Sequence, residues 1–419
     1  MTDSDRDRLD GGPTPIAEAV AVLEDQLGPI DRTETVPIGE AKGQVLPNAI
    51  VADRNLPAYR RSERDGYAVR AADTTDAAGT EPSVFSTTTG AIGTGETAYV
   101  HTGSAVPEGA DAVVMIENVS EMPEEGAKPE TDGQSGNRIK IRAPVESGAY
   151  VTPIGADLQT GTSLFEAGHR LRPGDLGALK LAGVRKIPVL DAPTVAVIPT
   201  GEELVQSDPD PGEVVETNGL VGSTQVEQWC GTARYRDVVT DEESALQAAI
   251  ERDLDADLIV TTGGSSVGSR DLLPSVVADR GEVLIRGLAL RPGHSAGFGV
   301  VSGTPIAMLP GTPIASLVVA SLVVRPALAT AVGTQPVDPP TVQATLETEL
   351  HSEAGRRTVH GVTLDNGGGQ TDSPVARTAE RGGLPSLTGI DGWVQVAESS
   401  TELTVGESVP VERWGVSFC

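Results

Sequence analysis

The chain has 419 residues and a formal net charge of −29 at pH 7. This length corresponds to roughly two to four domains. So acidic a chain is not expected to bind nucleic acid, because nucleic-acid-binding proteins present a basic surface to the phosphates. The sequence has no apolar run that approaches ~18 residues, so we expect no membrane span.

The remaining features of composition indicate a cytoplasmic protein. The first residues, MTDSDRDRLDGG, are charged and lack the apolar core of a secretory signal. Cys230 and Cys419 are the two cysteines, which gives no disulfide framework and suits a reducing interior. We therefore predict a soluble protein of the cytoplasm.

The acidity itself has a pattern. Acidic residues are spread along the chain, and Lys supplies only five of the 31 basic residues. Disorder is not expected, because apolar runs recur throughout. Spread acidity with few lysines resembles the proteins of extreme halophiles, where strong salt screens self-repulsion over a Debye length of ~3 Å at 1 M.

The N-terminal half is predicted to be rich in β-structure. Residues 13–28 place apolar side chains at helical spacing, and Gly28 ends this predicted helix. From about residue 30 to 190, Gly, Pro and Thr surround short apolar runs, which predicts strands and loops. The acidic stretch 120–137, rich in Gly and Pro, predicts an exposed hairpin or loop.

Residues 191–332 alternate strand-like and helical patterns, which is typical of a parallel, doubly wound α/β domain. Thr240, followed three residues later by Glu243, predicts a capping box at the start of a helix. The strands are expected at 194–199, 234–239, 257–262 and 305–309. The helices are expected at 217–229, 241–253, 271–280 and 313–332.

The C-terminal part returns to a β pattern. Residues 333–340, GTQPVDPP, predict a linker. Residues 341–413 alternate apolar and polar side chains with turn signals between them, which predicts a small β-barrel or sandwich.

The stretch LIVTTGGSSVG, residues 258–268, is the most informative part of the chain. A strand that enters a glycine-rich turn and then a helix gathers backbone N–H groups and hydroxyls at one point, which suits a phosphate or another oxyanion. Alone, a plain tight turn between strand and helix explains it equally well. LPGTP, residues 309–313, is a second such loop. Two of them predict a ligand crevice at the carboxyl ends of parallel strands.

From about residue 12 to 414, the chain resembles the molybdopterin molybdenumtransferase family, which includes the E domain of gephyrin. The order and spacing of eight motifs carry the resemblance. They are LPAYRRSERDGYAVRAAD (56–73), VHTGSAVPEGADAVVMIEN (100–118), PIGADLQTG (153–161), PTGEEL (199–204), ETNG (216–219), TTGGSSVGSRD (261–271), RPGHSAGFG (291–299) and LPGTPIAS (309–316).

The resemblance implies an activity and an assembly. The family joins molybdate to molybdopterin, with adenylylated molybdopterin as the substrate, release of AMP and a requirement for Mg²⁺. It also implies a homodimer, whose site lies between the α/β domain of one subunit and the N-terminal lobes of the other, and an adenylyltransferase as a partner.

The implied fold is multidomain α/β plus β, with a doubly wound parallel α/β molybdopterin-binding domain, mixed β-rich N-terminal lobes and a small C-terminal β-barrel. We expect a discontinuous N-terminal lobe at 12–52 and 151–190, with a β-rich lobe inserted at 53–150. The molybdopterin-binding domain is expected at 191–332 and the barrel at 338–413.

Three carboxylates are the candidate metal ligands. Glu203, Asp241 and Asp271 each follow a predicted strand or open a predicted helix, so they are expected at the carboxyl edge of the sheet. There Mg²⁺ shares protein oxygens with a substrate phosphate. Asp241 has an alternative interpretation as a helix-terminal charge, because the first helical turn favours acids.

The resemblance adds residues in the N-terminal lobes. Asp65 precedes a glycine and by spacing alone is a turn residue, but the family keeps an acid here that faces the partner's site. Thr102 and Asp157 carry over in the same way, with a local turn hydrogen bond as the alternative. The implied catalytic residues are Asp65, Asp157, Glu203 and Asp241. The implied substrate-binding residues are Thr102, Gly263, Gly264, Ser265, Ser266, Asp271, Arg291, His294, Pro310, Gly311 and Pro313.

The chain departs from the family pattern at its cations. RPGHS stands where relatives carry Lys-Pro-Gly-Lys-Pro, so Arg291 keeps one charge while His294 replaces a Lys with a group that titrates near neutral pH. His360 falls near another basic position, and Thr312 replaces the usual Asn. An arginine cluster, Arg60, Arg61 and Arg64, stands where relatives carry mostly small or neutral residues, and Arg makes bidentate oxyanion contacts.

Two alternative functions remain open at this point. The α/β domain alone is similar to the molybdopterin adenylyltransferase, although that enzyme is essentially this one domain. A diverged, noncatalytic pterin-binding or scaffold protein is the other alternative.

Overall fold

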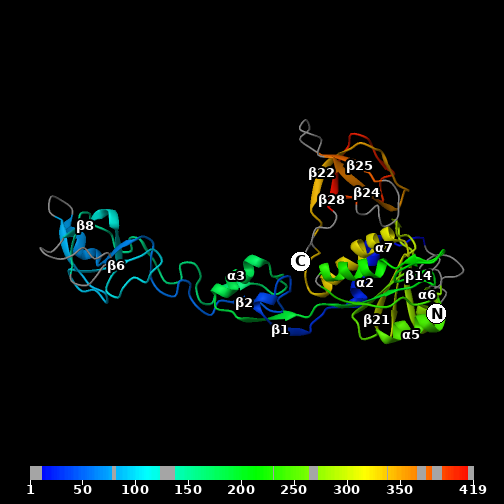
Figure 1. The fold of residues 1–419 in the computed structure, drawn as a ribbon, viewed down its shortest axis with the longest axis horizontal. Helices are drawn as coiled ribbons and strands as arrows, with labels where there is room; N and C mark the ends of the chain where they lie inside the picture. Colours follow the sequence, from blue (N-terminus) through cyan, green and yellow to red (C-terminus); the bar gives the residue numbers. More distant parts are fainter. Residues whose placement is uncertain are drawn as a thin grey trace. The chain divides into compact units, whose positions relative to one another are not determined.

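A computed structural model describes residues 12–77, 82–122, 137–229, 231–263, 272–336, 338–365, 374–379 and 389–413. The chain divides into two compact units. The first unit comprises Met1–Pro47, Gly168–Leu176 and Lys186–Cys419. The second comprises Asn48–Ala167 and Gly177–Arg185, so the chain leaves the first unit and returns to it (Figure 1).

The α/β domain of the first unit contains a six-stranded sheet. Four parallel strands occupy one side in the order β16 (Thr232–Tyr235), β13 (Thr194–Pro199), β17 (Leu258–Thr262) and β21 (Thr304–Leu309). The predicted doubly wound α/β domain is confirmed. Its other edge holds two antiparallel strands that the pattern did not predict, β20 (Gly297–Val301) and β18 (Gly281–Arg286).

Helices cover both faces of this sheet. They are α2 (Ile16–Leu27), α4 (Asn218–Gln228), α5 (Glu243–Arg252), α6 (Leu273–Arg280), α7 (Pro313–Val319), the π-helix η4 (Ala320–Val324) and α8 (Arg325–Ala331). Along β13, Val195 and Val197 join the core with α2, α7 and α8, while Ala196 and Ile198 join the core with α5 and α6. Because successive side chains of a strand point to opposite faces, these two cores lie on opposite sides of the sheet (Figure 1).

Two local expectations are wrong. Helix α5 begins at Glu243, its N-cap is Glu242, and no side chain caps it, so the capping box at Thr240 does not form. The strand expected at 234–239 ends at Tyr235. The N–H of Arg236 still donates to the carbonyl of Val197 at 2.9 Å, and Val239 then forms an isolated bridge with Thr200.

One helix is longer and more apolar than we expected, since the sequence analysis found no apolar run long enough to span a membrane. Pro313–Ala331 spans 19 residues with a mean hydropathy of 1.8, which by length and composition alone is enough to cross a membrane. Of the residues in the apolar stretch of this helix, 67% are buried inside the protein. Val318, Val319 and Val323 are completely inaccessible to solvent. The core helix of a soluble protein has the same composition, and the burial indicates that role.

The C-terminal β-barrel is confirmed. Its strands are β22 (Thr341–Leu346), β24 (Arg357–Asp365), β25 (Val375–Thr378), β26 (Gly392–Val396) and β28 (Ser408–Arg413), and pairing of β24 with β26 closes the ring. The short strand β19 (Leu290–Arg291) joins β24 in parallel and so attaches the barrel to the α/β domain.

The second unit is built on another six-stranded sheet, which agrees with the β-rich N-terminal expectation. Its order is β7 (Ala112–Met115), β4 (Gly66–Val69), β6 (Glu96–Val100), β5 (Ser83–Thr87), β9 (Arg138–Ile141) and β8 (Val119–Met122). Most of the stretch 120–137 lies outside the described residues, and its described start belongs to β8.

Short elements complete the two units. Paired short strands are β1 (Thr33–Pro37) with β12 (Lys186–Leu190), β2 (Ile50–Val51) with β11 (Ser163–Phe165), β3 (Arg61–Ser62) with β10 (Val151–Thr152), β14 (Leu204–Val205) with β15 (Val214–Val215), and β23 (Leu350–His351) with β27 (Glu402–Leu403). One unpredicted α-helix, α3 (Pro173–Leu181), and the 3₁₀ turns η1 (Ile38–Glu40), η2 (Ala71–Ala77) and η3 (Ile116–Asn118) connect them.

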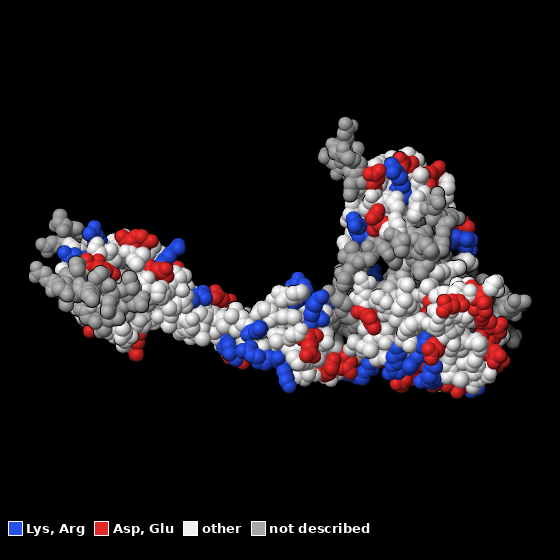
Figure 2. Space-filling view, viewed as in Figure 1, with Lys and Arg blue, Asp and Glu red and all other residues white. Residues whose placement is uncertain are grey.

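The acidic composition appears on the protein surface, and it generates a prediction. Figure 2 shows groups of Asp and Glu side chains on the visible face of the α/β domain. We expect the free energy of unfolding to rise between about 0.1 and 2 M KCl, because salt screens the self-repulsion of a chain with a net charge of −29. Denaturant titrations at each KCl concentration measure this, with equal osmolarity of sucrose as the control. A fall in stability with KCl would contradict salt adaptation.

Candidate functional site

Three parallel strands end together at the carboxyl edge of the α/β sheet. The N–H of Thr200, after β13, donates to the carbonyl of Thr262 at 3.2 Å, and the N–H of Gly263 donates to the carbonyl of Leu309 at 3.1 Å. The first residues of the three following loops are therefore held side by side. Both predicted ligand loops begin at this edge.

Gly263 occupies a position that only glycine fits. Its φ is +120°, and a Cβ there would lie 2.2 Å from the carbonyl oxygen of Thr200. Gly311, in the second loop, lies next to it, since its own Cβ would be 3.5 Å from the Cα of Gly263. The two loops thus meet backbone to backbone. The predicted residues Gly264, Ser265, Ser266 and Asp271 lie outside the described residues.

Two carboxylates at this edge repel each other. Burial, and then repulsion from Glu203, raise the pKa of Asp241 above its ordinary value, while a backbone N–H of Glu202 partly opposes the rise. A cation between Glu203 and Asp241 would relieve this repulsion, and an all-oxygen donor set is the one that Mg²⁺ prefers. These two predicted metal ligands therefore fit Mg²⁺.

Buried hydroxyl groups surround the strand ends. Thr200, Thr261 and Thr262 are each at most 2% exposed, and among the described residues their hydroxyl oxygens have no hydrogen-bond partner. A buried polar group without a partner is costly, so such groups mark places where a bound molecule or water completes the hydrogen bonding. Thr200 directly follows β13, and Thr261 and Thr262 are the last two residues of β17.

The LPGTP loop is held by residues that the sequence analysis left without a role. Asn218, at the start of α4, donates from Nδ2 to the carbonyl of Gly311 at 2.7 Å. Glu216, which is 5% exposed, accepts the N–H of Gly219 at 2.6 Å and the hydroxyl of Tyr235. Burial, followed by this hydrogen bond, raises the pKa of Tyr235 to about 12. The ETNG motif, residues 216–219, was the signal for these roles.

Pro310 and Pro313 frame the same loop. Pro313 is the first residue of α7, where its missing N–H costs nothing, and Thr312 is the N-cap although its side chain makes no capping bond. The loop thus leads directly into a buried helix.

Strand topology places RPGHS near this edge as well. Because β20 runs antiparallel to β21, its first residue, Gly297, pairs with Met308 near the end of β21. Residues 291–296 therefore lie at the carboxyl edge of the sheet. Arg291 and His294 are exposed there, and Arg291 forms an ion pair with Glu353 of the barrel at 3.1 Å. The loosely aligned His360 lies in the barrel and bonds the carbonyl of His351 through Nε2.

In the second unit, the structure brings Asp65 and Thr102 together. One carboxylate oxygen of Asp65 accepts the N–H of Thr102 at 2.6 Å and its hydroxyl at 3.0 Å, and these bonds lower the pKa of Asp65. His101 lies 4.0 Å from the same oxygen. The lowered pKa keeps the carboxylate of Asp65 ionised, and the side chain is exposed to solvent.

The other predicted residues of this unit lie beside the same strands. Asp157 approaches Arg61 at 3.6 Å, where β3 pairs with β10. Arg60 donates to the carbonyl of Ala110 at 2.7 Å, a structural contact. Of the arginine cluster, Arg61 is therefore the member engaged with a predicted site residue.

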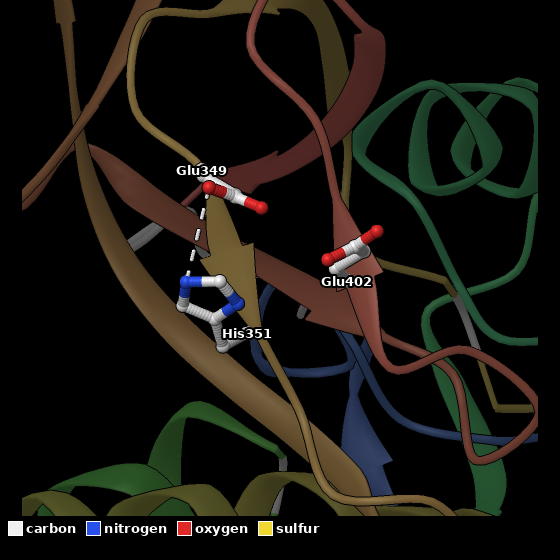
Figure 3. A group of neighbouring side chains, drawn as sticks. All are labelled: Glu349, His351 and Glu402. Carbon is white, nitrogen blue, oxygen red and sulfur yellow. Dashed lines mark ion pairs between the residues drawn. The ribbon is translucent and has the colours of Figure 1, made fainter.

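A further group of metal-ligating side chains lies on the barrel and includes none of the predicted ligands. Figure 3 shows Glu349, His351 and Glu402, whose ligand atoms lie within 4.8 Å of one another. His351 stands opposite Glu402 in the β23–β27 pair, and its Nε2 is 3.9 Å from Glu349. All three side chains are exposed.

The first prediction from this sheet edge concerns Gly263. Gly263→Ala should lower the free energy of unfolding by about 1–3 kcal/mol, because the new Cβ clashes with the Thr200 carbonyl. The matched control is Gly303→Ala, at φ +88° with nothing within 4 Å of its Cβ, which tests the backbone strain alone. Equal losses in the two variants, measured by denaturant titration, would show that the close approach carries no cost.

The second prediction concerns Asp241. Since folding raises the pKa of this carboxyl above its ordinary 3.8, stability is highest while it is protonated and falls as pH rises through its titration in the folded protein. In metal-free protein, Asp241→Asn should remove this fall and so stabilise the protein at pH 7. Thermal unfolding from pH 4 to 7 measures it, with the exposed Asp279→Asn as control. A wild-type pH profile retained by Asp241→Asn would show that the two carboxylates do not interact.

Comparisons with known proteins cover nearly the whole chain. The family model "MoeA N-terminal region (domain I and II)" matches residues 14–183, and "Probable molybdopterin binding domain" matches residues 196–330. The molybdopterin molybdenumtransferase 2 of Mycobacterium tuberculosis is 30% identical over 400 residues, which cover 91% of this chain and 95% of that protein. The molybdopterin molybdenumtransferase of Bacillus subtilis is 33% identical over 311 residues, which cover 71% of this chain and 70% of that protein.

A solved structure extends the likeness to the fold. The molybdopterin biosynthesis MoeA protein from Pyrococcus horikoshii superimposes with a TM-score of 0.80 at 30% identity, covering 96% of this chain and 99% of that one. Sequence and fold agree over the same residues, and the chain belongs to the molybdopterin molybdenumtransferase family.

Proposed function

We propose that this protein inserts molybdenum from molybdate into adenylylated molybdopterin, with release of AMP, in a Mg²⁺-dependent reaction. One observation carries the proposal. The two glycine loops that begin at Gly263 and Gly311 meet at the same sheet edge as the carboxylate pair Glu203 and Asp241. This edge offers neutral donors for phosphates beside oxygens for a divalent cation.

The loops are proposed to hold the substrate's phosphates. The backbone N–H of Gly264 and the hydroxyls of Ser265 and Ser266 are the proposed donors to the phosphate, and the 310–313 loop forms the other side of the site. The buried hydroxyls of Thr200 and Thr262 would complete their hydrogen bonds when the site is filled.

Glu203 and Asp241 are the proposed Mg²⁺ ligands, with Asp271 as the third. Bound Mg²⁺ supplies positive charge that offsets the charge developing on the leaving phosphate of AMP. The residues contribute fixed oxygens, and burial, together with repulsion from Glu203, raises the pKa of Asp241 while no cation is bound.

Molybdate is proposed to bind at the 291–294 loop. Arg291 already pairs with an anionic group, Glu353, so its guanidinium is placed where an oxyanion substitutes for that carboxylate. Exposed ion pairs contribute little free energy, so replacing the Glu353 carboxylate by an oxyanion on Arg291 costs little. His294, which is also exposed, adds a hydrogen-bond donor at this loop.

The second unit is proposed to complete the site of a neighbouring copy in a homodimer. Asp65 is held ionised by Thr102, and Asp157 lies beside Arg61. We propose a cytoplasmic, salt-adapted enzyme that receives its adenylylated substrate from an adenylyltransferase partner. The full-length match to molybdenumtransferases supports this function over the adenylyltransferase and the noncatalytic alternatives.

The decisive experiment follows AMP release from adenylylated molybdopterin with Mg²⁺ and molybdate. Asp241→Ala should reduce turnover by roughly 10²-fold or more while pterin binding, measured by calorimetry, changes little. Asp279→Ala is the surface control. Full turnover by Asp241→Ala at limiting Mg²⁺ would exclude the carboxylate pair from the reaction.

A mixing experiment tests the shared site. If Asp65 acts in trans, combining inactive Asp65→Ala with inactive Asp241→Ala produces heterodimers with one intact site. Such heterodimers should recover about half the activity of a wild-type dimer. Heterodimers that native mass spectrometry detects but that remain inactive would place the whole site within one chain.

A further inference from the structure

A cavity of about 340 Å³ lies in the first unit between the α/β domain and the barrel. Its walls come from α4, from the long helix α7–η4–α8, and from the barrel strands β26 and β28. Small-molecule sites occupy roughly 300–1,000 Å³ and occur preferentially between domains. Within the part of the chain that the structure describes, neither Gly263 and Gly311 nor the Glu203–Asp241 pair lines this cavity.

Aromatic side chains are concentrated here. Aromatic residues make up only 3% of the chain, which has three tryptophans, yet Trp229 and Trp393 both line this one cavity. Leu220 lies in the same wall and is 56% exposed, although it is a large apolar side chain. Such a wall provides flat apolar surface for an aromatic ring.

The charge of the cavity is opposite to that of the chain. Its charged lining residues are Arg325, Arg413 and Glu412, a net charge of +1 in a protein of −29. Glu412 already accepts hydrogen bonds from the indole N–H of Trp393 at 2.7 Å and from Gln395. Burial lowers the pKa of Arg325, and the carboxylates of Glu412 and Asp338 oppose this. A partly desolvated guanidinium in an apolar wall favours an anion.

The helix geometry is irregular at the same place. The π-helix Ala320–Val324 supplies Ser321 to the cavity wall, and π segments are frequent at functional sites. Nε of Arg325 donates to the carbonyl of Ser321 at 3.2 Å. Gln225 donates to the Ser321 hydroxyl at 3.4 Å, while its own buried Oε1 has no partner among the described residues.

We propose that this cavity binds a small aromatic carboxylate. The ring packs against Trp229 and Trp393, and the carboxylate lies on Arg325 and Arg413. Helix α4 forms one wall of the cavity, and its first residue, Asn218, holds Gly311 at the carboxyl edge of the sheet. An occupant therefore contacts the same helix that supports the LPGTP loop.

The test compares 2-naphthoate with its neutral amide, 2-naphthamide, by calorimetry on the full chain. Because a charge-assisted hydrogen bond is lost, the amide should bind at least about tenfold more weakly. Leu220 is exposed, so Leu220→Glu and Leu220→Gln both preserve the core and differ only in charge. Leu220→Glu should weaken naphthoate binding by about tenfold relative to Leu220→Gln, and Arg413→Gln should weaken it similarly.

The surface variant Arg138→Gln, in the second unit, is the control for loss of one positive charge and should bind like wild type. Equal binding of naphthoate and naphthamide, equal binding by the two Leu220 variants, or no binding by wild type would each overturn the proposal. Sedimentation of the same samples tests a second copy as the occupant. A shift toward monomer with Leu220→Glu alone would assign this face to a subunit interface and also overturn it.

Discussion

The close approach of Gly263 to the carbonyl of Thr200 is the constraint on which the candidate site depends. It allows the loop after β17 to leave the sheet directly against the end of β13, while the N–H of Gly263 bonds the end of β21. Three strand ends are thereby held within hydrogen-bonding distance. Any side chain at this position would separate them, because its Cβ would lie 2.2 Å from the carbonyl oxygen of Thr200.

The sequence predicted those parts of the site that follow from topology. Residues that come directly after neighbouring parallel strands must meet at one edge, so Glu203 and Asp241 were expected together, and the effect of Glu203 on the pKa of Asp241 supports that expectation. The parallel strands themselves are β-branched runs between helical patterns. The sequence pattern did not predict strands β18 and β20, because β18 begins immediately after α6 without a turn and carries a bulge near Val283. Their hairpin nevertheless places residues 291–296 at the site.

Contacts between residues that are distant in the sequence could not be predicted from the sequence pattern. Asn218 and Gly311 are 93 residues apart, and the partner of Arg291 is Glu353, on the barrel. No periodicity records such pairs. The Asn218–Gly311 contact depends on how α4 and α7 pack in the α/β domain, and the Arg291–Glu353 pair depends on how β19 attaches the barrel to that domain. The Asp65–Thr102 pair was accessible only through the family resemblance, since an Asp before Gly is otherwise an ordinary turn residue.

The acidity of the chain gives these separate observations a common physical basis. A protein with a net charge of −29 repels phosphates and oxyanions at long range, and high salt removes that repulsion together with the benefit of surface lysines. Recognition must then come from short-range groups that salt screens little. Backbone N–H groups at glycine loops, buried hydroxyls, a carboxylate pair suited to a divalent cation, and planar guanidinium groups all act at contact distance. The carboxyl edge of the sheet collects the first three of these, and the nearby Arg291 supplies the fourth. Of the 31 basic residues only five are lysines, and two arginines of the predicted site regions lie beside carboxylates, Arg291 beside Glu353 and Arg61 beside Asp157.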